Sequence, residues 1–340
     1  MTPPGSRPAH HRDGGFQNSD GDFEPRSLAD VIRWKWSAAR QGLPKRPTEP
    51  IPTQAPDLGF IRANAGAAQA PAVTWIGHAT VLAQLGGLNL LTDPIFSERA
   101  SPLPFAGPKR EQPPGVALQD IMPVIDVVLV SHNHYDHLDL PSCSALADRP
   151  GGGPLFVVPL GLQAWFQARG IARVVELDWW QSHAVDGVEI FLVPAQHWSA
   201  RGINDRMKTL WGGFAVFAPD CQLFFAGDTG YSRDFAEIKA RFADRQQGGG
   251  FDIALIPIGA YEPRWFMKEQ HVNVEEALKI HADLGAKRSL GVHWGTFELT
   301  DEALDEPPRQ LVQQRAALGM PEDEFFALAI GETRRIPRRG

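Results

Sequence analysis

The feature that most constrains this chain is a short apolar segment, IDVVLV at residues 125–130, that runs directly into the polar segment SHNHYDHLDL at 131–140. The apolar segment has the length and the β-branched composition of a buried strand. The polar segment places three of the chain's eleven histidines, together with two aspartates, within nine positions. So dense a group of imidazoles and carboxylates at the end of a strand favours a metal site over an ordinary polar turn.

The spacing within this polar segment favours two binding points. His132, His134 and Asp136 are separated by two residues each, and alternate side chains of an extended segment point to the same side. These three side chains can therefore converge, whereas His137 has to face a second point.

Three further candidate ligands follow other apolar runs. The run IFLVPAQH ends at His197, LFFAGD ends at Asp228 and SLGVH ends at His293. The end of a strand is a rigid platform, so residues that are far apart in the sequence can meet when each one follows a different strand. The repeated pattern predicts that all these groups meet at one place.

The predicted ligand set contains five imidazoles and two carboxylates, from His132, His134, Asp136, His137, His197, Asp228 and His293. The chain has only two cysteines, too few for a thiolate cage. Nitrogen and oxygen ligands suit zinc, and they also suit iron or manganese. Seven ligands exceed one tetrahedral site, so the set predicts two metal ions that share a bridging carboxylate.

The patterning of the chain predicts one folded domain behind an N-terminal extension. Residues 1–25 are rich in Pro, Gly, Asp and His, which predicts a disordered tail. Residues 26–60 contain a predicted helix in SLADVIRWKWSAARQG, with Ser27 as its N-cap, and a proline-rich connector. Residues 61–340 contain short β-type runs, hairpin-like at first and later alternating with helical segments. This order predicts packed sheets covered by helices.

One later helix has a clear predicted start. In NVEEALKIHADLG, Asn273 is followed three residues later by Glu276. This spacing is typical of a capping box, in which two side chains satisfy free N–H groups at the start of a helix.

Charge and hydropathy exclude several classes of function. The net charge of −7 and the absence of a long Lys/Arg block argue against nucleic-acid binding. The longest apolar runs are strand-sized and too short to span a bilayer, and the N-terminus has no apolar signal core. The low cysteine count fits a reducing compartment, so we expect a cytoplasmic protein that can make peripheral contact with a membrane.

The ligand pattern resembles that of the metallo-β-lactamase superfamily, and longer segments resemble the family of N-acyl-phosphatidylethanolamine-hydrolysing phospholipases D. These segments follow one another between residues 73 and 297, and they include VTWIGHATV, LTDPIFSERASP, SHNHYDHLDL, QHWSAR, FFAGDTGY, RWFMKEQHV and HWGTF. Two of them, LTDPIFSERASP and RWFMKEQHV, are the most specific, because metal binding requires neither.

The resemblance implies an α/β (α+β) fold, the αββα sandwich of two mixed β-sheets flanked by helices. It also implies which metal each ligand binds. One zinc is held by His132, His134 and His197, and the other by Asp136, His137 and His293. Asp228 bridges the two ions, and the residues expected to contact substrate are Tyr135 and His271.

The reaction implied by the resemblance is the hydrolysis of N-acyl-phosphatidylethanolamine to N-acylethanolamine and phosphatidic acid. A hydroxide held between the two metals attacks phosphorus in line. Asp136 and Asp228 act as ligands, and Asp228 also positions the hydroxide. His271 lies just before a predicted helix N-terminus and is expected to donate a hydrogen bond to the phosphoryl group. A phospholipid is therefore the expected partner, and the sequence leaves the oligomeric state open, with a homodimer as one option.

Several other residues are open to two interpretations. We assign His78 to hydrogen bonding in a loop or the core rather than to metal ligation, and His10 and His11 to the solvated tail. Three tryptophans either belong to the core or line an acyl pocket: Trp198, Trp265 and Trp294. The segment RWKW at 33–36 is either an interfacial anchor or packs back on the domain.

Other functions stay open at this level. One alternative is another hydrolase of the same superfamily, such as a phosphorylated-sugar lactonase or a soluble phosphodiesterase. A non-catalytic metal-bound scaffold is a further alternative, although such a scaffold has no need for a complete set of seven ligands. A comparison of substrates on the purified protein decides between them.

Overall fold

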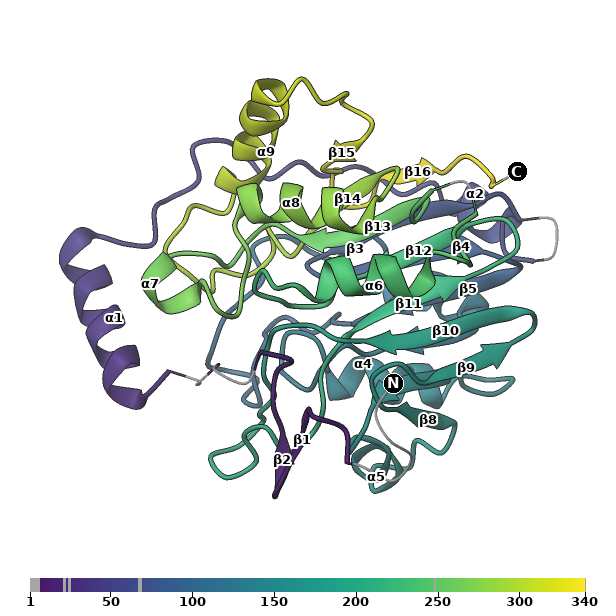
Figure 1. Ribbon diagram of the computed structural model, residues 1–340, viewed down its shortest axis with the longest axis horizontal. Coiled ribbons are helices and arrows are strands. Elements are labelled where there is room, and N and C mark those ends of the chain that lie inside the picture. The colour runs from purple at the N-terminus through teal and green to yellow at the C-terminus, as the bar shows by residue number, and fades with distance from the viewer. Residues whose placement is uncertain (1–6, 21–22, 24–25, 67–68, 248, 340) are drawn as a thin grey trace.

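The chain folds into four layers, in which two β-sheets pack face to face and helices cover both outer faces (Figure 1). The computed structural model describes residues 7–20, 23, 26–66, 69–247 and 249–339. Each sheet has seven strands in the described part of the chain, and a separate two-stranded hairpin lies near the N-terminus. The predicted αββα sandwich is therefore confirmed.

The first sheet has an antiparallel half followed by a parallel half. From β16 to β5 neighbouring strands are antiparallel, and from β5 to β8 they are parallel. The strands, in their order across the sheet, are β16 (Thr333–Arg335), β3 (Ala72–Gly77), β4 (Thr80–Leu85), β5 (Leu88–Thr92), β6 (Val127–Leu129), β7 (Leu155–Pro159) and β8 (Val174–Leu177).

The second sheet repeats this design. It is antiparallel from β9 to β12 and parallel from β12 to β15. Its strands, in order across the sheet, are β15 (Phe325–Phe326), β14 (Ser289–Val292), β13 (Ile253–Pro257), β12 (Gln222–Phe225), β11 (Gly213–Phe217), β10 (Val188–Val193) and β9 (Ser182–Val185).

Strand direction places the metal-type residues at one edge of the sandwich. Strands β10, β12 and β14 run in the same direction, because β10 and β12 are both antiparallel to β11 and β12 to β14 are parallel. By the same argument β3, β5 and β6 run together in the first sheet. The segments that leave the carboxyl ends of these strands therefore meet.

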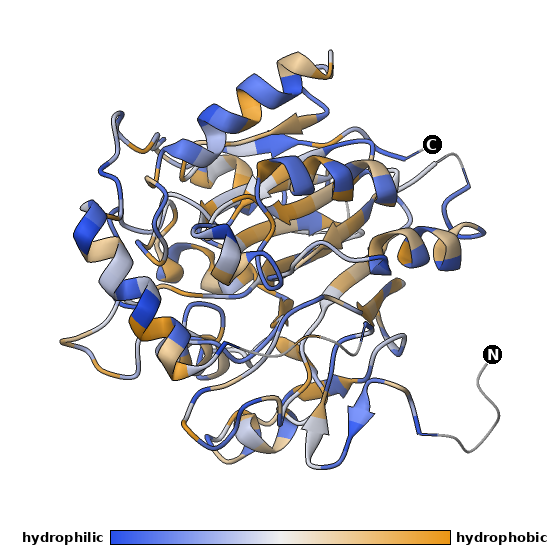
Figure 2. Ribbon diagram, turned by 60° about the vertical axis from the view of Figure 1, so that its left-hand side comes forward, coloured by the Kyte–Doolittle hydropathy of each residue, from blue (hydrophilic) through white to orange (hydrophobic). Residues whose placement is uncertain are grey.

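The helices pack on the outer faces of the sheets. Beside the first sheet the chain forms α2 (Leu58–Ala63), α3 (Leu118–Ile121), the 3₁₀ turn η1 (Met122–Val124), α4 (Leu140–Ala147) and α5 (Gln163–Gln167). Beside the second sheet it forms α6 (Asp234–Phe242), α8 (Val274–Leu284) and α9 (Glu306–Ala317). Figure 2 shows strands that are largely apolar between helices that carry apolar and polar residues. The capping box of α8 is confirmed, since Asn273 and Glu276 bond to each other's backbone N–H groups.

The alternation along β4 illustrates how the sequence fills two cores. Val81 and Ala83 belong to the large apolar core that includes the space between the sheets. Leu82, between them, belongs to the second core, beneath α2, α4 and α5. Both faces of this strand are covered, so every residue of TVLAQL is buried.

The N-terminal segment differs from the predicted disordered tail. Residues 7–20 are described, and they contain the hairpin β1 (His11–Arg12) and β2 (Gly15–Phe16). Phe16 is buried in the main core, and its backbone N–H donates to the carbonyl of Met207. The domain provides enough apolar and hydrogen-bonding partners to order this segment. The composition of the segment did not indicate this order, because the partners lie elsewhere in the chain. The rest of the predicted tail, residues 1–6, 21–22 and 24–25, lies outside the described residues.

Helix α1 (Leu28–Gln41) begins at the predicted N-cap, Ser27. It lies at one end of the molecule in Figure 1, beside the short helix α7 (Arg264–Met267). Trp34 packs in a small cluster with Phe266, and its Nε1 donates to Asp301 at 2.8 Å. One tryptophan of RWKW therefore packs back on the domain, whereas Trp36 is 62% exposed. No helix in the described part of the chain is both long and apolar enough to cross a membrane.

Candidate metal centre

Three histidines form the first group of the candidate centre. Nδ1 of His134 lies 2.8 Å from Nε2 of His132 and 3.3 Å from Nε2 of His197. His132 and His134 follow β6 in the first sheet, and His197 follows β10 in the second. The two sheets therefore supply ligands to the same group.

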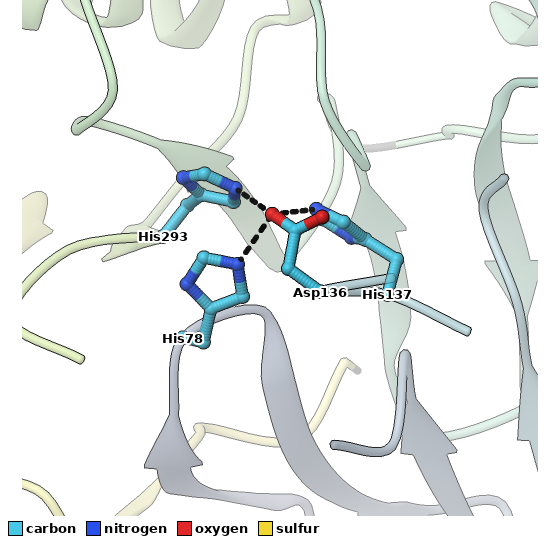
Figure 3. Close-up of side chains that lie close together, drawn as sticks. All are labelled: His78, Asp136, His137 and His293. Atoms are coloured by element: carbon cyan, nitrogen blue, oxygen red, sulfur yellow. Dashed lines mark hydrogen bonds and ion pairs between the residues drawn. The ribbon is translucent and has the colours of Figure 1, made fainter. Parts of the chain in front are cut away.

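The second group contains Asp136, His137 and His293. Oδ2 of Asp136 lies 3.4 Å from Nε2 of His137 and 3.5 Å from Nε2 of His293. Figure 3 shows the side chains of His137 and His293 pointing toward the Asp136 carboxylate. His137 and His293 are buried, and Asp136 is partly buried.

Asp228, which follows β12, lies between the two groups. Its Oδ2 is 3.8 Å from Nε2 of His132 and 3.7 Å from Nε2 of His197. The same oxygen is 3.1 Å from Nε2 of His137, while Oδ1 is 3.2 Å from Nε2 of His293. One carboxylate therefore faces the nitrogens of both groups, as a bridging ligand has to do.

These residues fit a pair of divalent cations. Ligand atoms around a tetrahedral zinc, with bonds of about 2.0 Å, lie about 3.3 Å apart, and the separations above, from 2.8 to 3.8 Å, bracket this value. Several of the inward-facing atoms are buried and have no hydrogen-bond partner among the described residues: Nε2 of His137, Nε2 of His293 and Oδ1 of Asp228. Unpaired buried groups of this kind are costly unless something binds them.

The electrostatics differ between the two groups. Burial alone would lower the pKa of His137 and His293, but the Asp136 and Asp228 carboxylates raise that of His137 well above its usual value and that of His293 to about 9. A cation at the second group would therefore displace protons from these two imidazoles. Burial lowers the pKa of His132 well below its usual value and that of His134 to about 3, so both imidazoles are neutral and offer lone pairs. Burial alone would raise the pKa of Asp228, but His137 and His293 lower it well below its usual range. This carboxylate is therefore ionised.

The outward nitrogens of three histidines are held by neighbours. Nδ1 of His132 lies 2.9 Å from Oγ of Ser131, and Nδ1 of His197 lies 2.9 Å from the carbonyl of Gln270. Nδ1 of His137 lies 2.6 Å from Oδ2 of Asp93. Such contacts fix the orientation of a ligating imidazole and raise its basicity.

Asp93 is a residue that the sequence reading missed. It follows β5 directly and is fully buried, and it also accepts hydrogen bonds from the backbone N–H and the hydroxyl of Ser131. Its position in LTDPIF obeys the same strand-end rule that identified His197, Asp228 and His293. That signal could have found it.

His78 follows β3 and lies beside the second group (Figure 3). Its Nε2 is 3.1 Å from Oδ2 of Asp136, a contact that fits the predicted hydrogen-bonding role. Burial and the neighbouring His293 lower the pKa of His78 to about 3, so the ring is neutral. Its Nε2 is also close enough to Asp136, His137 and His293 for all four to hold one ion.

His271 points into the centre from the segment before α8. Its Nδ1 lies 3.9 Å from Oδ2 of Asp228 and, though buried, has no hydrogen-bond partner among the described residues. Its ring is 5.2 Å from that of His197 and 5.5 Å from that of His293. Burial holds its pKa well below the usual value. A neutral imidazole with a free nitrogen therefore faces the centre.

Tyr135 lies in the loop of residues 131–139, here called the ligand loop because it carries four of the candidate ligands. The hydroxyl of Tyr135 is already hydrogen-bonded. It donates to the carbonyl of Arg201 at 3.0 Å, and the Arg201 guanidinium lies 3.9 Å from the Tyr135 ring. Arg201 also donates to the carbonyls of Asn133 and Leu138. The Tyr135–Arg201 pair thus supports the loop that carries the ligands.

This pair also lines a cleft of about 520 Å³ on the protein surface. The cleft contains two more arginines, Arg99 and Arg169, and apolar groups from Leu103 and Trp165. Its lining also includes the carboxylates of Glu98 and Asp139, so three arginines exceed two acidic residues by one charge. It therefore combines positive charge with apolar surface next to the ligand loop.

The three tryptophans considered for an acyl pocket have different environments. Trp294 is buried and stacks on Trp75 at 4.8 Å, so it belongs to the core. Trp198 packs edge-on against His134 at 4.4 Å. Trp265 is 42% exposed and lies under Arg33 of α1. None of the three lines the cleft that contains Arg201.

Asn18 connects the N-terminal segment to the centre. Its Nδ2 donates to the carbonyl of His197, and its Oδ1 accepts from the N–H of His197, both at 3.0 Å. The same oxygen accepts from Nε1 of Trp211. Because it bonds both backbone groups of a candidate ligand, the buried Asn18 is a further site residue that the prediction of a disordered tail had hidden.

Comparison with known proteins places this geometry in a family. Residues 88–294 match the beta-lactamase superfamily domain. An uncharacterized protein of Mycobacterium tuberculosis is 38% identical over 331 residues, which cover 94% of this chain and 82% of that protein. N-acyl-phosphatidylethanolamine-hydrolyzing phospholipase D 1 of Caenorhabditis elegans is 40% identical over 271 residues, 76% of this chain and 74% of that protein.

A solved structure agrees on the fold. The isothiocyanate hydrolase from Delia radicum gut bacteria superposes with a TM-score of 0.60 and 20% identity, covering 78% of this chain and 99% of that one. At this identity the likeness concerns the fold alone.

Proposed function

Because this chain belongs to the β-lactamase superfamily, and within it to the family that includes the C. elegans phospholipase D, we propose that it hydrolyses N-acyl-phosphatidylethanolamine to N-acylethanolamine and phosphatidic acid. The fold and the relatives make it a metal-dependent hydrolase. The single observation that carries the proposal is the pair of ligand groups joined by Asp228 beside a cleft that is both basic and apolar.

The chain's own residues would hold two ions, for which zinc is our proposal. His132, His134 and His197 would hold one, Asp136, His137 and His293 would hold the other, and Asp228 faces both groups. When bound, such a pair supplies an activated water nucleophile and positive charge opposite the phosphate. Asp136 and Asp228 stay ionised and act as ligands, so neither serves as a free general base.

His271 is placed to donate a hydrogen bond to the phosphate of the substrate. A neutral imidazole can donate a hydrogen bond to a phosphoryl oxygen as negative charge develops there. The free Nδ1 of His271 faces Asp228 at 3.9 Å, which leaves this nitrogen directed at the centre. Tyr135 contacts the substrate through its ring, because its hydroxyl donates to the carbonyl of Arg201.

The cleft is suited to the phospholipid. Arg99, Arg169 and Arg201 offer positive charge for a phosphate, while Leu103 and Trp165 offer contact to acyl chains. A phosphorylated-sugar lactone or a soluble phosphodiester would use the arginines but not the apolar wall.

The protein makes peripheral contact with the membrane through the outer face of α1. Leu28, Ile32 and Trp36 are spaced by four residues and are 75%, 62% and 62% exposed. Residues spaced in this way lie on one side of a helix. Residues 26–41 carry four basic side chains and one acidic side chain, a balance suited to an anionic lipid surface. Figure 2 shows the apolar and polar residues of α1 along its length.

The loop before β11 extends this face toward the cleft. The Arg206 side chain donates to the carbonyl of Arg26, just before α1, and Ile203 in the same loop is 98% exposed. Arg201, at the start of this loop, lines the cleft. A lipid bound at the outer face of α1 would therefore lie near the cleft.

The test is a comparison of substrates with the purified zinc-loaded protein. We expect turnover of N-acyl-phosphatidylethanolamine to exceed that of a phosphorylated-sugar lactone and of a soluble phosphodiester. In H₂¹⁸O the label should appear in phosphatidic acid, because water forms the new P–O bond. The P–O bond to the N-acylethanolamine breaks, so this product keeps its original oxygen atom and takes up a proton. Label in the N-acylethanolamine, or preference for the lactone, would contradict the proposal.

The Asp228→Asn variant is the control for the centre. It should lose activity far more severely than Tyr135→Phe, because Asp228 faces both ligand groups while the Tyr135 hydroxyl only bonds a backbone carbonyl. Wild-type protein that binds two metals without turning over any of these substrates would indicate a non-catalytic scaffold.

A further inference from the structure

A second group of metal-type side chains lies outside the catalytic centre. Nε2 of His10 is 2.6 Å from Oδ1 of Asp178, and Nε2 of His11 is 2.7 Å from Oδ2 of the same carboxylate. His10 and Asp178 are buried, and His11 is half-buried. Two consecutive histidines from the N-terminal segment thus point at one carboxylate of the domain, which follows β8.

The neighbours of this group hold the three side chains in place. The His10 ring stacks on Trp179, with ring centres 4.3 Å apart and an angle of 27°. The edge of the His11 ring meets Phe16, which is anchored in the main core. The backbone N–H of Trp179 donates to Oδ1 of Asp178 at 2.9 Å. The cluster is therefore built from packed residues rather than from free surface side chains.

We propose that His10, His11 and Asp178 bind a divalent transition-metal cation, separate from the two ions of the catalytic centre. Two imidazole nitrogens and one carboxylate oxygen are ligands that zinc, nickel and copper accept. The three ligand atoms lie within 4.8 Å of one another. Around zinc these atoms would lie about 3.3 Å apart. The short contact to the ligating oxygen, 2.6 Å from His10 or 2.7 Å from His11, therefore has to open by only about 0.6 to 0.7 Å, with a water molecule as the fourth ligand.

This site gives the N-terminal segment a second attachment near the catalytic centre. The cation fastens His10 and His11 to the domain, and Asn18, in the same described segment, bonds both backbone groups of His197. A cation bound by His10, His11 and Asp178 therefore favours the docked position of Asn18, which supports the candidate ligand His197.

The test is a calorimetric titration of zinc into protein that already holds two zinc ions per chain. We expect wild-type protein to bind one further equivalent. His11→Ala and Asp178→Asn should bind that equivalent at least tenfold more weakly, because even the loss of an outer partner of a metal ligand costs roughly 10- to 100-fold in affinity. The matched control is His183→Ala, since His183 on β9 belongs to none of the metal-type groups of the described residues, and it should bind like wild type.

A second measurement keeps the proposal testable if these variants fail to fold. Copper or nickel, added to wild-type protein loaded with two zinc ions, should quench the fluorescence of Trp179 because the His10 ring lies on it. The quenching should disappear in Trp179→Phe. Wild-type protein that binds no third equivalent and is not quenched would show a purely hydrogen-bonded His–Asp–His group and overturn the proposal. Both readouts measure binding, so their outcome does not depend on which substrate the enzyme hydrolyses.

Discussion

Nδ1 of His137 lies 2.6 Å from Oδ2 of Asp93, and both side chains are fully buried. Asp93 also accepts two hydrogen bonds from Ser131, whose hydroxyl in turn lies 2.9 Å from Nδ1 of His132. One carboxylate at the end of β5 therefore orients a candidate ligand in each of the two groups, directly for His137 and through Ser131 for His132. The charge of Asp93 also stabilises a cation bound to the opposite side of the His137 ring.

We expect Asp93→Asn to lower metal affinity or activity by roughly 10- to 100-fold, the range for losing an outer partner of a metal ligand. The substitution keeps the size of the side chain but removes its charge. Metal content after dialysis against a chelator, together with kcat/KM, measures the effect. Asp139→Asn is the matched control for metal content, because Asp139 is also buried next to the candidate ligands but bonds Ser97 and Ser142 instead of a histidine. Equal metal retention in both variants would contradict the role of Asp93.

His271→Ala should keep both catalytic metals and the Tm while lowering kcat/KM by roughly 10- to 1000-fold, as for the loss of a hydrogen bond that strengthens in the transition state. The reason is that its free Nδ1 faces the centre but lies 3.9 Å from Asp228. Steady-state kinetics and elemental analysis of the same sample check this. His281→Ala, which removes a buried histidine bonded to Ser289, should affect stability and not kinetics. Loss of a metal in His271→Ala would identify His271 as a ligand, and unchanged kinetics would make it structural.

Asn18→Ala should lower the free energy of unfolding by about 1–3 kcal/mol, because it leaves the buried N–H and C=O of His197 without a partner. It should also weaken metal binding in the group that contains His197. Chemical denaturation and metal content provide the two readouts. Gln17→Ala, at the neighbouring half-buried position, should change the stability by less than about 0.5 kcal/mol. If Asn18→Ala behaved like this control, the segment would have no part in the centre.

The double variant Ile32→Ser with Trp36→Ser should weaken binding to anionic vesicles by about tenfold or more, since each apolar side chain contributes up to about 1.5–3 kcal/mol when it is buried. Turnover of a short-chain substrate and the Tm should stay the same, because both side chains are exposed. Vesicle sedimentation measures the binding. Trp34→Ala is the contrasting change, because Trp34 is buried; it should lower the stability by about 3–5 kcal/mol. Unchanged vesicle binding in the double variant would exclude α1 as the membrane contact.

The seven candidate ligands could be found from the sequence because each one follows an apolar strand. A strand fixes the direction in which the chain leaves the sheet, and strands that run in the same direction deliver their following residues to one edge. The two-residue spacing of His132, His134 and Asp136 also predicted that their three side chains converge. The same local logic predicted the helix starts at Ser27 and Asn273, where short-range hydrogen bonds decide the structure.

The strand-end rule could have found Asp93, but the pairing of each orienting residue with its ligand required the tertiary structure. Asp93 meets His137 across 44 positions, and Asn18 meets His197 across 179. No local pattern encodes such a pairing, because it depends on how the two sheets stack and on where the N-terminal segment docks. The contact of His10 and His11 with Asp178 was missed for the same reason: a polar, proline-rich segment has no apolar periodicity, and its order comes from partners that only the folded domain provides. The sequence by itself therefore determined which groups gather as candidate metal ligands, through strand ends and alternation, while the packing of distant segments decided which groups hold those candidate ligands in place.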